Sequence, residues 1–230
     1  MLPWIHLDTA DLPDGGQLKL LRRGNEFSIV TGASTLMNSR MSGSEIALAE
    51  LACDRLRDRN NCRMLIGGYG MGFTLRAALA RLGGGAQVVV AELVPAVLRW
   101  ALGPMAELTD GCLSDPRVSL LEVDVADFIA SSRAHFDAIL LDVDNGPDGL
   151  TQGTNGRLYN LQGLRTARKA LVPGGLLGVW SAAPDTAFKR RLGHAGFTVD
   201  EITARAHKGR GARNVVWIAT HGRQDSRREP

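Results

Sequence analysis

Cysteine is scarce in this chain of 230 residues, and its scarcity excludes several kinds of protein. The three cysteines, Cys53, Cys62 and Cys112, are too few and too widely spaced for a disulfide framework or a zinc knuckle. The five histidines show no metal-ligand spacing either. We therefore predict three unpaired thiols and chemistry that uses no metal.

Long apolar runs are also missing. No run reaches the ~18 residues that a membrane span needs, and residues 1–12 lack the basic-then-apolar order of a signal peptide. Hydrophobic residues still make up 44% of the chain, which is ordinary for a globular protein with a sizeable core. We expect a cytoplasmic protein that has no membrane partner.

Acidic residues are slightly fewer than basic ones, 24 against 27, and the basic excess is unevenly spread. One late segment and the C-terminal tail are rich in basic residues, and such clusters can attract nucleic acid or an anionic substrate. Because no aromatic residue is interleaved with the late segment, we expect a solvated loop there and no nucleic-acid partner. The segment contains Arg205, His207, Lys208, Arg210 and Arg213.

The first 45 residues have the pattern of a small β structure. Three short β-capable runs, at 17–22, 26–31 and 34–38, are separated by glycine-containing turns. We predict a hairpin or meander over residues 1–45, a main domain over residues 46–221, and a polar tail over residues 222–230.

In the main domain, strand and helix patterns alternate, which predicts a doubly wound α/β fold with a mostly parallel sheet. The last two strands are closely spaced, which favours an antiparallel final strand, as in the Rossmann-like sheet of class I methyltransferases. The expected strands are 63–66, 87–91, 118–122, 138–141, 176–180, 197–202 and 215–220; the expected helices are 46–57, 73–82, 94–107, 125–132, 161–171 and 184–195.

A glycine-rich loop joins the first of these strands to a helix. Glycine allows a sharp turn and a close ligand approach, and the helix N-terminus offers free N–H groups. The order strand, loop, helix strengthens an otherwise weak motif. We predict that this loop binds a nucleoside of the S-adenosylmethionine type through Gly67, Gly68, Tyr69, Gly70 and Gly72.

Two acidic residues follow the next two strands. Glu92, with Leu93 beside it, ends a strand 20 residues after Gly72, where a carboxylate can accept hydrogen bonds from both ribose hydroxyls; the alternative is a surface glutamate that opens a helix. Asp124, followed by Val125, either caps the next helix or binds the adenine amino group.

A third acidic group follows the strand 138–141. Asp142 and Asp144, with Asn145, leave a buried strand where open sheets bind ligands, and neighbouring acids there can serve as a base or hold an amine. An Asx turn is the alternative. We predict that Asp142 and Asp144 are catalytic and that Asp144, Asn145 and Tyr159 contact the substrate. The segment 150–160 between this strand and the next helix is a candidate lid.

These motifs together resemble the polyamine aminopropyltransferases, the spermidine synthase family. The resemblance extends from about residue 24 to residue 220. It is clearest at 73–76, which follows the glycine loop, and at 91–93, 115–118, 136–142 and 171–175.

The resemblance implies roles for three carboxylates. Glu92 would be the ribose-binding acid, Asp124 the adenine-binding acid, and Asp142 the aspartate that deprotonates and orients the attacking amine. It also implies a small N-terminal β domain and a homodimer. The transferred group would come from a sulfonium donor, S-adenosylmethionine or its decarboxylated form.

The chain departs from the family pattern at several positions. Gly70 stands where the family has a loop aspartate, residues 43–46 lack the family's tyrosine–histidine pair, and residues 142–146 differ from Asp-Ser-Thr-Asp-Pro. The decarboxylated donor is cationic and favours a carboxylate, whereas intact S-adenosylmethionine also carries a carboxylate that suits free loop N–H groups.

We therefore predict methyl transfer to an amine or hydroxyl on a small-molecule acceptor. Aminopropyl transfer to a diamine from decarboxylated S-adenosylmethionine is the first alternative. A nucleoside-binding protein without catalytic activity is the second.

Overall fold

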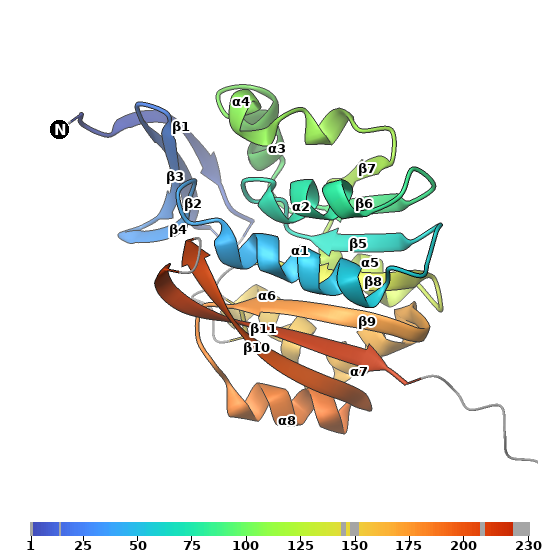
Figure 1. Ribbon diagram of the computed structural model, residues 1–230. Helices are drawn as coiled ribbons and strands as arrows, with labels where there is room; N and C mark the ends of the chain where they lie inside the picture. The colour runs from blue at the N-terminus through green and yellow to red at the C-terminus, as the bar shows by residue number, and fades with distance from the viewer. Residues whose placement is uncertain (1, 14, 144–145, 148–151, 208–209, 223–230) are drawn as a thin grey trace, which may run out of the picture.

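The computed structural model describes residues 2–13, 15–143, 146–147, 152–207 and 210–222, which form two β-sheets and their covering helices (Figure 1). The smaller sheet is antiparallel, in the order β1-β2-β3-β4, and the larger sheet has seven strands. The mixed α/β fold class and the small N-terminal β segment that we predicted are confirmed.

The small sheet is built by alternation of apolar and polar residues. In β2 the inward residues Leu18 and Leu20 are buried while Gln17 and Lys19 are exposed, so one face packs onto the main core. We did not predict β1, because it is an edge strand whose first four residues are exposed and show no burial pattern. The strands are β1 (Ile5–Asp11), β2 (Gln17–Arg23), β3 (Glu26–Thr31) and β4 (Ser34–Asn38).

The large sheet has the order β10-β11-β9-β8-β5-β6-β7, with β9, β8, β5, β6 and β7 parallel. β11 is antiparallel to both of its neighbours. The central strand β8 is buried at all six residues, as expected of a parallel strand with both faces covered. The strands are β5 (Arg63–Gly67), β6 (Gln87–Ala91), β7 (Val118–Leu121), β8 (Phe136–Leu141), β9 (Leu171–Ser181), β10 (Phe197–His207) and β11 (Arg210–His221).

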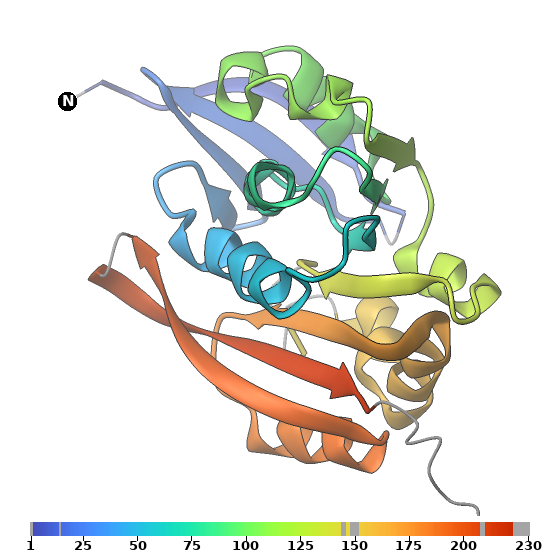
Figure 2. The same ribbon diagram turned by 45° about the vertical axis from the view of Figure 1, so that its right-hand side comes forward.

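Helices cover both faces of the large sheet. Figure 2 shows α1 and α2 on one side and α7 and α8 on the other, and the two core clusters divide in the same way. The first side is formed by α1 (Gly43–Arg55), α2 (Phe73–Arg81) and α3 (Pro95–Leu102), followed by the short α4 (Ala106–Thr109) and η1 (Cys112–Ser114). The second side is formed by α5 (Val125–Ser131), α6 (Gln152–Tyr159), α7 (Leu161–Ala170) and α8 (Thr186–His194).

Three elements differ from our expectations. The helix predicted over 94–107 ends at Leu102, because Pro104 has no N–H and disfavours helical geometry at Gly103. β9 begins at residue 171 and bulges at 172–175, since Phe136 pairs with Leu171 while Ala138 pairs with Leu176. The candidate lid contains α6, and residues 148–151 lie outside the described part of the chain.

The basic segment also differs from our expectation. We predicted a solvated loop between residues 202 and 215, but β10 and β11 extend through most of it and pair as far as His207 and Arg210. β11 pairs with β9 over residues 215–220, starting at Val215, which lies opposite Ser181. The part of the hairpin before Val215 therefore projects beyond the end of β9. Long-range pairing explains the extension, because the segment itself has no apolar alternation.

The order of connections places a ligand site at one edge of the sheet. The chain runs from β5 through β6 to β7 on one side, and then returns to β8 on the other side of β5. Open α/β sheets bind ligands outside the carboxyl ends of strands at such a reversal. Gly67, Ala91 and Leu141, the last residues of β5, β6 and β8, meet at this edge.

Candidate functional site

A cavity lies between this edge and the small sheet. Its lining comes from the small sheet and its loops, through Leu18 and Leu36, and from the carboxyl ends of the parallel strands, through Gly68, Glu92 and Asp142. Most of the remaining lining is aliphatic. An apolar cavity with a few convergent polar groups is the usual form of a site for a small organic ligand.

The glycine loop brings two backbone segments into close contact. Gly68 has a φ of +84°, and a Cβ at this position would collide with the Asp142 carbonyl oxygen. The backbone N–H of Asp142 donates to the Gly67 carbonyl over 3.0 Å. Glycine is therefore required by the approach of β5 to β8, and it also leaves the cavity open at this point.

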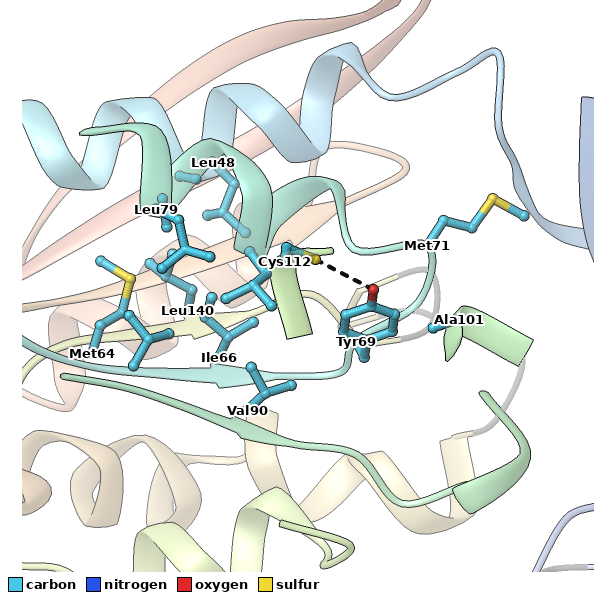
Figure 3. Close-up of a cluster of buried hydrophobic side chains, with 14 of the residues drawn as sticks. Leu48, Met64, Ile66, Tyr69, Met71, Leu79, Val90, Ala101, Cys112 and Leu140 are labelled. Atoms are coloured by element: carbon cyan, nitrogen blue, oxygen red, sulfur yellow. Dashed lines mark hydrogen bonds between the residues drawn. The ribbon is translucent and has the colours of Figure 1, made fainter. Parts of the chain in front are cut away.

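The Tyr69 side chain turns away from the cavity edge and into the core. Figure 3 shows its ring among buried apolar side chains, with the hydroxyl directed at Cys112. The hydroxyl oxygen lies 3.5 Å from the Cys112 Sγ, and burial raises the pKa of the phenol. The Tyr69 side chain is only 3% exposed, so packing in the core accounts for most of its surface.

Glu92 fixes the loop and keeps hydrogen-bonding capacity for a ligand. Its Oε2 accepts the Tyr69 backbone N–H at 2.9 Å, and its Oε1 accepts the Val94 backbone N–H at 2.8 Å. The residue is only 7% exposed, and burial raises the pKa of its carboxyl group. Each carboxylate oxygen can accept a further hydrogen bond, and Glu92 lines the cavity, as ribose binding requires. Leu93 lies beside it in the lining.

Asp124 takes the capping role that the sequence allowed. Its Oδ1 accepts the Ala126 backbone N–H at 2.7 Å, and its Oδ2 forms an ion pair of 2.5 Å with Arg157 of α6. Asp124 and Val125 both line the cavity. Capping and adenine binding are compatible, because an ionised carboxylate has about four acceptor positions; adenine binding stays a prediction.

A smaller cavity adjoins the first and shares Met37, Gly70 and Asp142 with it. Among the residues that the structure describes, Glu45 and Asp142 are the charged residues of its lining. Apolar and aromatic side chains, together with Asn38, form the other walls: Leu36, Met37, Tyr69, Met71, Phe73 and Trp180.

Thr74 connects the two acidic residues of the smaller cavity. Its hydroxyl donates a hydrogen bond of 2.5 Å to Asp142 Oδ2 and lies 3.3 Å from the Glu45 carbonyl oxygen. The Ser44 hydroxyl donates to Glu45 Oε2 at 2.7 Å. Three segments far apart in the chain, at residues 44–45, 74 and 142, are thus joined around the carboxylates.

The pKa values of both carboxyl groups are raised above their ordinary values. Burial and, to a smaller extent, the negative charge of Glu45 raise the pKa of Asp142 to about 7, and the Thr74 hydrogen bond opposes this effect. Burial also raises the pKa of Glu45, opposed by the hydrogen bond from Ser44. Like charges in a partly desolvated site disfavour double ionisation, so the pair is suited to hold a proton or a cation.

Sequence reasoning missed Glu45 and Thr74. Glu45 directly precedes the helix expected over 46–57, and Thr74 lies in the segment 73–76 that carries the family resemblance, but neither residue was given a role in the site. The position of Glu45 three residues after Ser42, in the first turn of the helix that precedes the glycine loop, was the one available signal. Its proximity to Asp142 depends on how α1 packs against the sheet.

Of the predicted substrate residues Asp144, Asn145 and Tyr159, the structure describes Tyr159. Asp144 and Asn145 lie outside the described residues. Tyr159 is buried in the second core cluster, with its ring centroid 5.7 Å from that of Phe188, and it lines neither cavity. Tyr159 therefore packs in the core and does not face either cavity, contrary to the expected contact with the acceptor.

The described residues contain neither a metal-ligand cluster nor a membrane-spanning helix. No group of three or more histidine, cysteine, aspartate or glutamate side chains is arranged there to hold a metal ion. No described helix is both long enough and apolar enough to cross a membrane.

Comparison with known proteins supports the family resemblance. No protein-family model matches the chain. Over 123 residues, 53% of this chain and 22% of the relative, it is 32% identical to polyamine aminopropyltransferase 1 of Streptomyces coelicolor. Over 145 residues, 59% of this chain and 27% of the relative, it is 34% identical to the polyamine aminopropyltransferase of Mycobacterium tuberculosis. The matched segment thus spans about a quarter of the length of these relatives.

Solved structures show the same fold. A spermidine synthase in complex with the transition-state analogue AdoDATO superposes with a TM-score of 0.72 at 16% identity, covering 94% of this chain and 72% of that one. Spermidine synthase from Thermotoga maritima gives the same TM-score of 0.72 at 16% identity, covering 94% and 73%. A probable spermidine synthase from Corynebacterium glutamicum gives 0.63 at 15% identity, covering 94% and 79%.

The predicted resemblance to the spermidine synthase family is therefore confirmed in sequence and in fold. The preference for methyl transfer is not supported, because the curated relatives are aminopropyltransferases.

Proposed function

We propose that this chain transfers an aminopropyl group from decarboxylated S-adenosylmethionine to an amine acceptor. The observation that carries the proposal is the second cavity, whose charged lining residues among those described are Glu45 and Asp142. A cavity with two carboxylates and with aromatic walls from Phe73 and Trp180 suits an ammonium group on a short alkyl chain. The curated relatives that share the sequence motifs are polyamine aminopropyltransferases.

The larger cavity has the polar groups that a nucleoside donor needs. Glu92 would accept hydrogen bonds from the ribose hydroxyls, and Asp124 would accept one from the adenine amino group. The sulfonium end of the donor would then face Asp142, which borders both cavities. Holding nucleophile and leaving group in line is the main requirement of this reaction.

Asp142 would act as the general base. The acceptor amine attacks the propyl carbon bonded to sulfur, the C–N bond forms, and the C–S electron pair leaves with methylthioadenosine. The proton of the amine passes to the Asp142 carboxylate. A base with a pKa of about 7 can both take up and release a proton near neutral pH. Glu45 would compensate the charge of the bound amine.

The loop leaves the donor's amino group without the family's acidic partner. At Gly70, a Cβ would lie 2.9 Å from Met37 Sδ, so Met37 of β4 occupies the space that an aspartate side chain would need. Glu45 and Asp142 line the smaller cavity together with Gly70. We propose that one of them also contacts the donor's amino group. A homodimer and a cytoplasmic location remain predictions.

Two measurements test the proposal. Titration calorimetry should show tighter binding of decarboxylated S-adenosylmethionine than of the intact compound, and a mixture of the decarboxylated donor with small amines should release methylthioadenosine and yield an aminopropylated product by mass spectrometry. Asp142→Asn should retain nucleoside binding and lose turnover. Tighter binding of intact S-adenosylmethionine, together with transfer of methyl groups only, would refute the proposal.

A further inference from the structure

The hydroxyl of Thr74 donates a hydrogen bond to the carboxylate that we propose as the base. It lies 2.5 Å from Oδ2 of Asp142 and 3.3 Å from the Glu45 carbonyl oxygen. A hydroxyl has one hydrogen to donate, and the shorter contact indicates that Asp142 receives it. In the described part of the chain no other group donates to the Asp142 carboxylate, so Oδ1 remains available to a ligand.

The fold holds Thr74 in place. The residue is only 2% exposed, and it is the second residue of α2, directly after the glycine loop. Threonine is branched at Cβ, so its χ1 has little freedom in a helix. The loop that would hold the donor therefore also determines where the Thr74 hydroxyl lies.

A carboxylate that acts as a base gains from such a contact. The χ2 angle of an aspartate varies over a broad range when nothing restrains it. A base has to stand at about 2.6–3.2 Å from the atom whose proton it takes, and a small misplacement in a catalytic site is costly in rate. A hydrogen bond at Oδ2 restricts the rotation of Asp142 and thereby fixes the direction of Oδ1.

We propose that Thr74 is a positioning residue, whose hydroxyl holds Oδ2 of Asp142 so that Oδ1 takes up the proton of the acceptor amine. This inference rests on the proposed aminopropyl transfer. Thr74 lines neither of the two cavities that Asp142 borders, so it acts through Asp142 and does not itself contact donor or acceptor.

The same hydrogen bond favours the ionised form of Asp142. Burial and the negative charge of Glu45 raise the pKa of Asp142, whereas the Thr74 hydroxyl lowers it. The other charged residues in the described lining of the two cavities are Glu92 and Asp124. Loss of the Thr74 hydroxyl should therefore raise the pKa of Asp142 further, which is opposite in sign to the effect of removing the Glu45 charge.

Thr74→Val keeps the branched shape of the side chain and removes the hydroxyl. This variant should move the acidic limb of the kcat/KM profile to higher pH by about one pH unit and should lower kcat by about tenfold or more. Its affinity for methylthioadenosine should not change. Thr74→Ser retains the hydroxyl and should return the limb to its wild-type position.

Thr109→Val is the matched control for the loss of a buried hydroxyl. Thr109 is 3% exposed, and its hydroxyl contacts the carbonyl oxygens of Ala101 and Ala106. This variant should leave the acidic limb in place.

Thermal melts detect the contact between Thr74 and Asp142 without turnover. Thr74→Val should lower the Tm more at about pH 9 than at about pH 4, because a hydrogen bond to an ionised carboxylate is stronger than one to a neutral carboxyl group. When Asp142→Asn is also present, this pH dependence should disappear.

An acidic limb that stays in place in Thr74→Val, or that Thr74→Ser does not restore, would overturn the inference and leave aminopropyl transfer intact. If the wild type transfers no aminopropyl group to any amine while the melts show the expected pH dependence, the contact between Thr74 and Asp142 is upheld and the proposed reaction is refuted.

Discussion

The backbone N–H of Tyr69 donates a hydrogen bond of 2.9 Å to Oε2 of Glu92, so one carboxylate fixes the glycine loop and also borders the larger cavity. Its second oxygen, Oε1, accepts the Val94 N–H. Glu92 therefore holds the loop after β5 and the start of α3 in fixed positions, while it faces the proposed ribose site. Four predictions follow from this and the neighbouring contacts.

Glu92→Ala should weaken methylthioadenosine binding by about 1–3 kcal/mol, or roughly fivefold to 150-fold, because the ribose hydroxyls lose their acceptor and two backbone N–H groups lose theirs. Calorimetric titration measures the change. Glu122→Ala, at an exposed acidic residue directly after β7, is the control and should bind normally. Equal affinity of the Glu92 variant and the wild type would refute the role in ribose binding.

Asp142→Asn should raise the Tm above about pH 7 and leave it almost unchanged near pH 4. The pKa of Asp142 is raised in the folded protein, so its ionisation costs more in the folded than in the unfolded state. The penalty is absent where both states are protonated, and it grows as the pH rises from about 4 to about 7. Thermal melts across this range test the effect.

Asp58→Asn, at an exposed position, is the control for these melts and should show no such pH dependence. An increase in Tm that is the same at every pH would mean that Asp142 ionises normally in the folded protein.

Glu45→Gln should move the acidic limb of the kcat/KM profile to lower pH, on the order of one pH unit. The negative charge of Glu45 raises the pKa of Asp142, so its removal lets Asp142 ionise at lower pH. Steady-state rates over a pH series give the profile. Glu50→Gln on the same helix, where Glu50 pairs with Arg81, should leave the limb in place. A limb that shifts to higher pH contradicts the coupling.

Gly70→Asp should destabilise the protein alone and become tolerable together with Met37→Ala. Gly70 has a φ of +57°, which aspartate adopts at modest cost, but its Cβ would lie 2.9 Å from Met37 Sδ. The double variant should bind decarboxylated S-adenosylmethionine more tightly than the parent, because the cationic amine gains a carboxylate.

Melting curves measure the stability of the Gly70→Asp variants with and without Met37→Ala, and calorimetry measures their affinity for decarboxylated S-adenosylmethionine. Equal stability of the two Gly70→Asp variants would show that Met37 does not limit the space at this position. Met37→Ala alone is the control for the loss of the thioether.

The sequence by itself determined the parallel sheet and the positions of the residues that we propose bind the nucleoside. An unbroken apolar run such as β8 is favourable only where both faces are covered, and the glycine loop stands directly between β5 and α2. Glu92, Asp124 and Asp142 each follow a parallel strand, so the topology brings all three to the lining of one cavity. These are short-range patterns, and they can be read without knowledge of the packing.

Only the tertiary structure decided which carboxylates act together and where each side chain points. Glu45 and Asp142 line one cavity, and Thr74 contacts the Asp142 carboxylate and the Glu45 backbone carbonyl, because α1 and α2 pack on the same face of the sheet. The Tyr69 ring turns into the core, although its backbone serves the loop. The extension of β10 and β11 through the basic segment depends on pairing between the two strands. Contacts between segments that are distant in the chain depend on packing, and packing cannot be predicted from the local pattern of apolar and polar residues.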